Sequence, residues 1–371
     1  MGKLDTSAVE ALARDPRSAA GLIEFLRLSN YRTRSFMDAL DEESPEDVLG
    51  HTALHALVAG EDFAASADPA ERLFALLTLG AAVAADGYDT ALPTHVRAAL
   101  EHGGIVVREA DGAARAAVSI VEYDGVFVVA DKLFELVSGE IQLDGEPLAM
   151  PPHFSTFRTL AAASRLPRAS SLLDVGTGAG SIPLLRRGGY EVVTGIDVQP
   201  RAVAMARLNA KLNGRPGLEF VVGDCLTFAD GRRYGHVIFN SPGEFELVDR
   251  FASRVGALLA PGGVCLVLAW LQLRADQTVD AYLRECAQRW RDVQVAARVI
   301  YGSPFSATRD EVTRARPRVG SYLTPDFLAQ LRTEHVSQRT EVELTFQPSA
   351  APCLSIVEED GPRVTPQPMF E

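Results

Sequence analysis

The spacing of apolar residues along the chain changes near residue 105. Between residues 7 and 103 the apolar positions recur at helical spacings, as Leu22, Phe25 and Leu26 do. Beyond residue 105, short β-type runs are separated by Asp-Gly pairs, which favour hairpin turns. The pattern therefore predicts helices followed by a small sheet. The β-type runs cover residues 105–108, 117–122 and 126–130.

Strand-like and helix-like segments alternate from residue 172 to residue 269. The strand-like segments are short apolar runs, and most of them are separated by segments with helical spacing. Such alternation predicts βαβ units in a parallel sheet that is covered on both faces, so the fold class is α/β. Two later runs, 293–300 and 341–346, are expected to be the final strands.

The two patterns predict two domains with a boundary at Pro151-Pro152. Residues 1–150 are expected to form a mainly helical, winged-helix-like domain with a small β-wing. Its role is either a lid that selects the substrate or a packing appendage. Residues 151–371 are expected to hold the parallel sheet, with a long insertion at about 301–332 that points to a functional loop.

The amino-acid composition disfavours several classes of partner and site. The 371 residues carry 36 Lys and Arg against 49 Asp and Glu, a net charge of −13, which disfavours a nucleic-acid partner. No apolar stretch is long enough to cross a bilayer, and no signal-peptide pattern is present, so we expect a cytoplasmic protein without a membrane partner. The four cysteines are widely spaced and predict neither disulfides nor a metal site.

A glycine-rich turn follows the first strand of the parallel sheet. Gly176, Gly178 and Gly180 form a G-x-G-x-G order, which lets a backbone approach a ligand closely but has no phosphate-loop lysine. Asp174 precedes the turn and can accept hydrogen bonds from an ammonium group. Asp197 ends the second strand, where an acidic residue binds ribose hydroxyls in such folds.

Four motifs in order give residues 151–270 a clear resemblance to class I S-adenosylmethionine-dependent methyltransferases. They are LDVGTGAG, GIDV, GDC and APGG. The resemblance implies a Rossmann-like, seven-stranded sheet with S-adenosylmethionine as cofactor. It also implies that Gly176 and Gly178 contact the methionine and ribose, that Asp197 binds the ribose, and that Asp224 and Cys225 lie near the adenine. The other cofactor-binding residues expected are Asp174, Thr177, Gly180, Val198 and Asn240.

The helical front domain and the loop after the fourth strand resemble the bacterial "methyltransferase small domain" group, which methylates nitrogen. In that group an Asn side chain and the next backbone carbonyl position a planar NH₂ group, and Asn240, Ser241 and Pro242 are the matching catalytic residues here. Gly243 departs from the pattern, because the group has an aromatic residue at this position. Glu244 and Phe245 follow directly and are expected either to contact a cationic or small polar substrate or to begin a helix.

Further candidates for substrate contact lie outside these motifs. His153 and Phe154 precede the first strand of the sheet, and Tyr301 and Ser303 lie at the start of the insertion, where an aromatic ring suits either a sulfonium or the core. Cys225 is expected to be a small buried residue and not a nucleophile.

Three functions are consistent with these residues. The first is methyl transfer to a small-molecule or protein acceptor, at nitrogen. The second is an aminocarboxypropyl transferase or a cyclase that acts on S-adenosylmethionine and releases methylthioadenosine. The third is an inactive binding module that serves as a partner. The sequence leaves the acceptor and the oligomeric state open.

Overall fold

The computed structural model describes residues 6–14, 16–143, 149–186, 189–243, 245–274, 276–300 and 338–358. The chain divides into two compact units. The first unit contains residues 1–157, 177–187 and 199–222, and the second contains residues 158–176, 188–198 and 223–371. The predicted domain boundary at residue 150 stays a prediction. No helix within the described residues is long and apolar enough to span a membrane.

The N-terminal part of the first unit is mainly helical, as its sequence pattern predicts. Two of its helices begin with a side-chain cap followed by proline: Ser44 accepts a hydrogen bond from the backbone N–H of Asp47, and Asp68 accepts one from that of Ala70. A 3₁₀ turn, η1, covers Thr33–Phe36. The helices are α1 (Thr6–Arg14), α2 (Pro16–Leu28), α3 (Met37–Leu40), α4 (Pro45–Gly50), α5 (Thr52–Ala65), α6 (Pro69–Leu77), α7 (Ala85–Ala91) and α8 (Thr94–His102).

Three antiparallel hairpins follow these helices. They are β1 and β2 (Val106–Arg108, Ala114–Ala116), β3 and β4 (Ser119–Tyr123, Val126–Ala130), and β5 and β6 (Phe134–Val137, Glu140–Leu143). The turn between β3 and β4 is the predicted Asp124-Gly125 pair, and both residues have positive φ, as a tight hairpin turn requires. The third hairpin is not among the predicted elements, and the winged-helix-like assignment stays a prediction.

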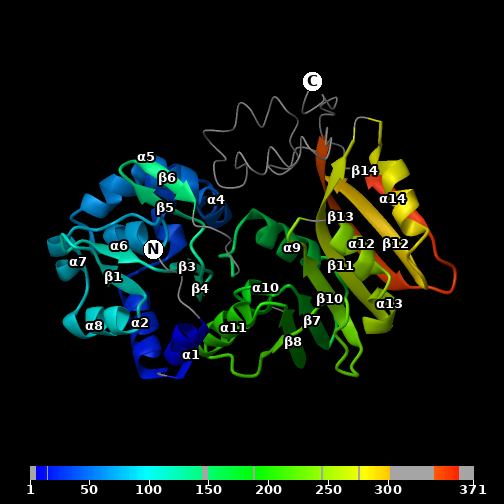
Figure 1. Ribbon diagram of the computed structural model, residues 1–371, viewed down its shortest axis with the longest axis horizontal. Coiled ribbons are helices and arrows are strands. Elements are labelled where there is room, and N and C mark those ends of the chain that lie inside the picture. Colours follow the sequence, from blue (N-terminus) through cyan, green and yellow to red (C-terminus); the bar gives the residue numbers. More distant parts are fainter. Residues whose placement is uncertain are drawn as a thin grey trace. The chain divides into compact units, whose positions relative to one another are not determined.

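The first unit also includes α10 (Ser181–Leu185), α11 (Pro200–Leu212) and β9 (Glu219–Val222). Asn209 of α11 and Asn213, which follows the last residue of that helix, each exchange two hydrogen bonds with the backbone of β4, at Val129 and Phe127 respectively. Arg201 forms an ion pair with buried Asp131. Asn209 is fully buried, so its two bonds are shielded from water, whereas those of Asn213 are part-buried. Together these bonds fix β4 on α11 (Figure 1).

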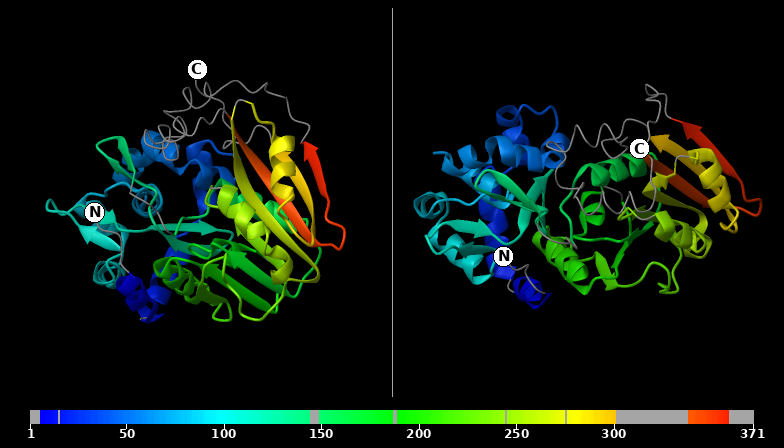
Figure 2. Two further views of the ribbon diagram at one scale, coloured as in Figure 1. Left: turned by 45° about the vertical axis from the view of Figure 1, so that its right-hand side comes forward. Right: turned by 45° about the horizontal axis from the view of Figure 1, so that its top comes forward.

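One mixed sheet of eight strands runs in the order β14-β12-β13-β11-β10-β7-β8-β9. The prediction of seven strands is therefore wrong by one, because β14 adds to β12 in parallel at the edge, where Figure 2 shows it in red. β13 is antiparallel to both of its neighbours, β11 and β12. The remaining strands are β7 (Ser171–Val175), β8 (Val192–Asp197), β10 (Tyr234–Asn240), β11 (Leu259–Leu273), β12 (Val293–Ile300), β13 (Gln338–Pro348) and β14 (Leu354–Glu358).

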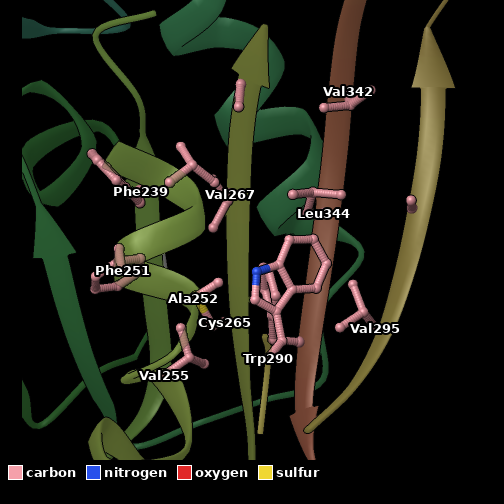
Figure 3. Close-up of a cluster of buried hydrophobic side chains, with 14 of the residues drawn as sticks. Phe239, Phe251, Ala252, Val255, Cys265, Val267, Trp290, Val295, Val342 and Leu344 are labelled. Carbon is pink, nitrogen blue, oxygen red and sulfur yellow. The ribbon is translucent and has the colours of Figure 1, made fainter. Parts of the chain in front are cut away.

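The core of the second unit lies on the sheet face covered by helices α12 (Phe245–Ala252), α13 (Val255–Leu258) and α14 (Val279–Ala287). Figure 3 shows Phe251 of α12 beside Phe239 of β10, and their rings meet edge to face at 5.2 Å. Trp290 contacts Phe346 of β13 in the same way. This packing holds β10 and β11 in place. The helix α9 (Phe154–Ser164) precedes the sheet in the chain.

Candidate functional site

The glycine turn that follows β7 requires glycine at several positions. Gly176, Gly178 and Gly180 have φ of 65°, 53° and 80°, values at which a residue with a side chain is strained. A Cβ on Gly180 would also lie 3.1 Å from Ala206 of α11. Thr177 is buried, and its carbonyl accepts the N–H of Gly180 at 2.8 Å. The predicted turn is therefore present, with backbone geometry suited to close approach of a ligand.

Three predicted site residues lie in one row at the carboxyl edge of the sheet. Val175 of β7 pairs with Ile196 of β8 and with Phe239 of β10, both in parallel. The next residues along these strands are Gly176, Asp197 and Asn240. Since neighbouring strands are about 4.8 Å apart, Asp197 and Asn240 stand roughly 10 Å from each other with the glycine between them.

The acidic residues at this edge have different environments. Asp174 is 1% exposed at the end of β7, whereas Asp197 is half-buried at the end of β8, and its carbonyl accepts the N–H of Gly223 at 2.9 Å. Val198, next in the chain, is 62% exposed, which is unusual for a valine. Asp197 and Val198 thus offer a carboxylate and an apolar surface side by side.

Asp224 and Cys225 follow β9 in a short turn. The Asp224 carboxylate accepts the backbone N–H of Leu226 at 2.8 Å, so part of its role is to form this turn. Burial raises the pKa of the Cys225 thiol to about 11, which keeps it protonated at neutral pH. Cys225 is half-buried and not fully buried as expected, and its assignment as a residue other than a nucleophile stays a prediction.

The loop after β10 is held by the neighbouring strand. Ser241 is buried, and its backbone N–H donates to Leu268 of β11 at 2.9 Å. Asn240 is half-buried, and Pro242 is exposed. This hydrogen bond fixes the backbone of the loop in which Asn240 and Ser241 are predicted to position an acceptor group.

Sequence reasoning missed two residues beside this loop, Trp270 of β11 and Arg339 of β13. Gly243 has φ 114°, and a Cβ at this position would lie 2.8 Å from the Trp270 ring. The guanidinium of Arg339 lies 4.1 Å from the centre of the same ring, in cation–π contact. Desolvation lowers the Arg339 pKa to about 10, against the effect of Glu341, so it stays charged at neutral pH. The Trp270 ring therefore covers Gly243, the position at which the related methyltransferases have an aromatic residue.

Replacing Gly243 with alanine is expected to destabilise the protein by about 1–3 kcal/mol, because the new methyl group collides with Trp270 and the backbone is strained. Denaturant unfolding measures this effect. The matched control is Gly189→Ala, since Gly189 has no heavy atom within 4 Å of its added Cβ, and we expect a change of at most about 0.5 kcal/mol there. Equal stability of the two variants would contradict the contact between Gly243 and Trp270.

The other predicted substrate residues have separate positions. His153 is buried in the first unit, where burial lowers its pKa to about 4 and keeps the ring neutral. The ring of Phe154 meets that of His51 edge to face at 4.9 Å. Phe245 is buried in the core of the second unit against Tyr282. Glu244, Tyr301 and Ser303 lie outside the described residues.

Comparison with known proteins finds relatives of part of the chain. Residues 157–295 match the family model described as methyltransferase small domain. The ribosomal protein L11 methyltransferase of Geobacter metallireducens is 30% identical over 154 residues, 38% of this chain and 47% of that protein. The ubiquinone biosynthesis O-methyltransferase of Paramagnetospirillum magneticum is 30% identical over 181 residues, 48% of this chain and 64% of that protein. The chain thus spans less than two thirds of either relative.

Solved structures with a related fold give lower overall similarity. A SAM-dependent methyltransferase from Geobacter sulfurreducens, in complex with S-adenosyl-L-homocysteine, is 20% identical with a TM-score of 0.34, covering 52% of this chain and 90% of that chain. Phosphoethanolamine N-methyltransferase 2 of Haemonchus contortus, in complex with S-adenosyl-L-methionine, is 14% identical with a TM-score of 0.36, covering 52% of each chain.

Proposed function

We propose that residues 157–295, which match the family model described as methyltransferase small domain, form a class I S-adenosylmethionine-dependent methyltransferase, and that this protein methylates a nitrogen atom of a small-molecule or protein acceptor. The observation that carries the proposal is the row of Gly176, Asp197 and Asn240 at the carboxyl edge of the sheet. In open α/β sheets this edge is where ligands bind.

The residues present fit S-adenosylmethionine. The glycine turn has no side chain at Gly176 and Gly178 and leaves its backbone open to the ligand. Asp197 would bind the two ribose hydroxyls, and Val198, whose side chain is exposed, would border the adenine. Asp174 and Thr177 would hold the methionine end, and Asp224 and Cys225 would lie near the adenine.

The chain itself supplies alignment. S-adenosylmethionine, when bound, provides a methyl carbon that its sulfonium already activates. The Asn240 side-chain oxygen and the Ser241 carbonyl accept hydrogen bonds from the acceptor NH₂ and direct its lone pair, and Pro242 limits the conformations of this loop. Because the backbone of this loop is hydrogen-bonded to β11, the loop is already ordered before the acceptor binds.

An aromatic side chain from β11, Trp270, lies beside the loop that is proposed to bind the acceptor. Trp270 covers Gly243, so no side chain of the loop itself fills this space. One relative is named for a protein acceptor, ribosomal protein L11, and another for a small-molecule pathway, ubiquinone biosynthesis. We place a small molecule first and a protein second, and the net charge of −13 disfavours nucleic acid.

The test is to incubate the full chain with S-adenosylmethionine and nitrogen-containing acceptors and to identify the products by mass spectrometry. Release of S-adenosylhomocysteine together with a methylated acceptor is expected. Release of methylthioadenosine would replace methyl transfer with the aminocarboxypropyl or cyclase reaction, which uses the same binding residues. Binding without any turnover across the acceptors would overturn the enzyme proposal in favour of a binding module.

A further inference from the structure

Two histidines and a glutamate converge in the first unit, apart from the residues assigned above. The Oε1 atom of Glu42 lies 2.8 Å from Nδ1 of His51 and 2.9 Å from Nε2 of His55. One ligand atom from each residue lies within 4.8 Å of the other two. The exposed fractions of the side chains are 14% for Glu42, 41% for His51 and 5% for His55.

The local structure explains why these side chains meet. His51 lies between α4 and α5, and His55 is four residues further along, where its N–H donates to the His51 carbonyl at 3.0 Å. Residues four apart lie on the same face of a helix. Glu42 follows Asp41, whose φ of 54° ends α3, and the Glu42 N–H donates to Met37 at 3.0 Å. The backbone thus brings the carboxylate to this helix face.

Hydrogen bonding alone leaves this cluster incomplete. Within the part of the chain that the structure describes, His55 Nε2 has no hydrogen-bond partner although it is buried. It lies 2.9 Å from Glu42 Oε1, the oxygen that also forms a hydrogen bond with His51 Nδ1 at 2.8 Å. A buried polar atom that lacks a hydrogen bond of its own is destabilising. A cation between the three side chains would satisfy this nitrogen and the carboxylate together.

We propose that Glu42, His51 and His55 bind a Zn²⁺ ion, with water as the fourth ligand. Two imidazole nitrogens and one carboxylate oxygen suit Zn²⁺, whereas Mg²⁺ and Ca²⁺ prefer oxygen ligands throughout. Atoms bound to a tetrahedral zinc at about 2.0–2.1 Å are about 3.3 Å apart, so only a small adjustment of these side chains is needed. The exposed side of His51 gives solvent access to the fourth position.

The ion has a structural consequence for its surroundings. It joins the loop between α3 and α4 to the first turn of α5. The ring of Phe154 lies against His51, so the ion also restrains the beginning of α9. Since metal binding favours the folded state only, the zinc-bound protein unfolds at a higher temperature than the metal-free protein.

The experiment uses the tag-free full chain carrying Cys353→Ser, because Cys353 is exposed and is itself a possible zinc ligand. After treatment with a chelator, Zn²⁺ is titrated by calorimetry and Co²⁺ by visible absorption. We expect one equivalent of Zn²⁺ and a four-coordinate Co²⁺ spectrum. Glu42→Gln and His51→Ala are each expected to weaken Zn²⁺ binding by more than about tenfold. His95→Ala removes an exposed histidine elsewhere and should bind as the parent does.

Glu42→Gln and His51→Ala are expected to stay folded, since Gln is close in shape to Glu and His51 is partly exposed, and circular dichroism checks this. The parent failing to bind Zn²⁺ would overturn the proposal. So would binding by both folded variants with the parent's affinity, because the ion would then lie elsewhere. Neither result bears on the methyltransferase proposal, whose residues lie outside this cluster.

Discussion

Asp197→Ala is expected to weaken S-adenosylmethionine binding by about a hundredfold or more. The carboxylate is half-buried at the end of β8, and it accepts two hydrogen bonds from the ribose in the proposed complex. Hydrogen bonds to a charged group contribute about 1.5–3 kcal/mol each. Loss of both therefore raises Kd by two orders of magnitude or more, since each 1.4 kcal/mol is about tenfold. Isothermal titration calorimetry with S-adenosylmethionine measures the change.

A matched control distinguishes the proposed contact from a general effect of charge. Asp280 is an exposed aspartate of the same unit, paired with Arg284 on α14. Asp280→Ala removes the same charge away from the sheet edge, and we expect it to bind S-adenosylmethionine with the parent's Kd. If Asp197→Ala is folded and also keeps the parent's Kd, the ribose is not bound at the end of β8.

The alternation of strands and helices was readable from sequence because the central parallel strands β7 and β10 are largely buried. They carry apolar runs for this reason, at Leu172-Leu173 and at 237–239, and their ends carry the motifs. The hairpin of β3 and β4 followed from Asp124-Gly125. The hairpin of β5 and β6 was missed because its turn is Ser138-Gly139, a less distinctive pair, although both residues have positive φ.

The remaining differences depend on contacts between distant parts of the chain. β14 pairs in parallel with β12, and nothing in its own five residues reports that partner. Trp270 and Arg339 lie on different strands, so only the antiparallel pairing of β11 with β13 brings them together. In the same way, the spacing of His51 and His55 is visible in the sequence, but the approach of Glu42 depends on the αL turn at Asp41. The spacing of motifs in the sequence identifies site residues at strand ends, whereas the residues that surround a site are brought together by tertiary packing.

Asn240→Ala is expected to lower kcat by about a hundredfold while leaving the Kd for S-adenosylmethionine within a few-fold of the parent's. Without the carboxamide, the acceptor NH₂ loses one of its two alignment bonds, and misplacement of reacting atoms by about 1 Å costs roughly this factor. The backbone of the loop should not change, because the Ser241 N–H still donates to Leu268. Steady-state kinetics with the acceptor found in the product assay gives kcat, and calorimetry gives Kd.

The control for Asn240→Ala is Gln294→Ala, which removes an exposed carboxamide from β12, where it donates to Gln347 at 2.7 Å. We expect parental kcat from this variant. A loss of kcat in Asn240→Ala with unchanged Kd would assign the side chain to acceptor alignment, because a role in cofactor binding alone would raise Kd as well. An unchanged kcat would contradict alignment by Asn240 and would leave the backbone carbonyl of Ser241 as the main acceptor contact at this strand end.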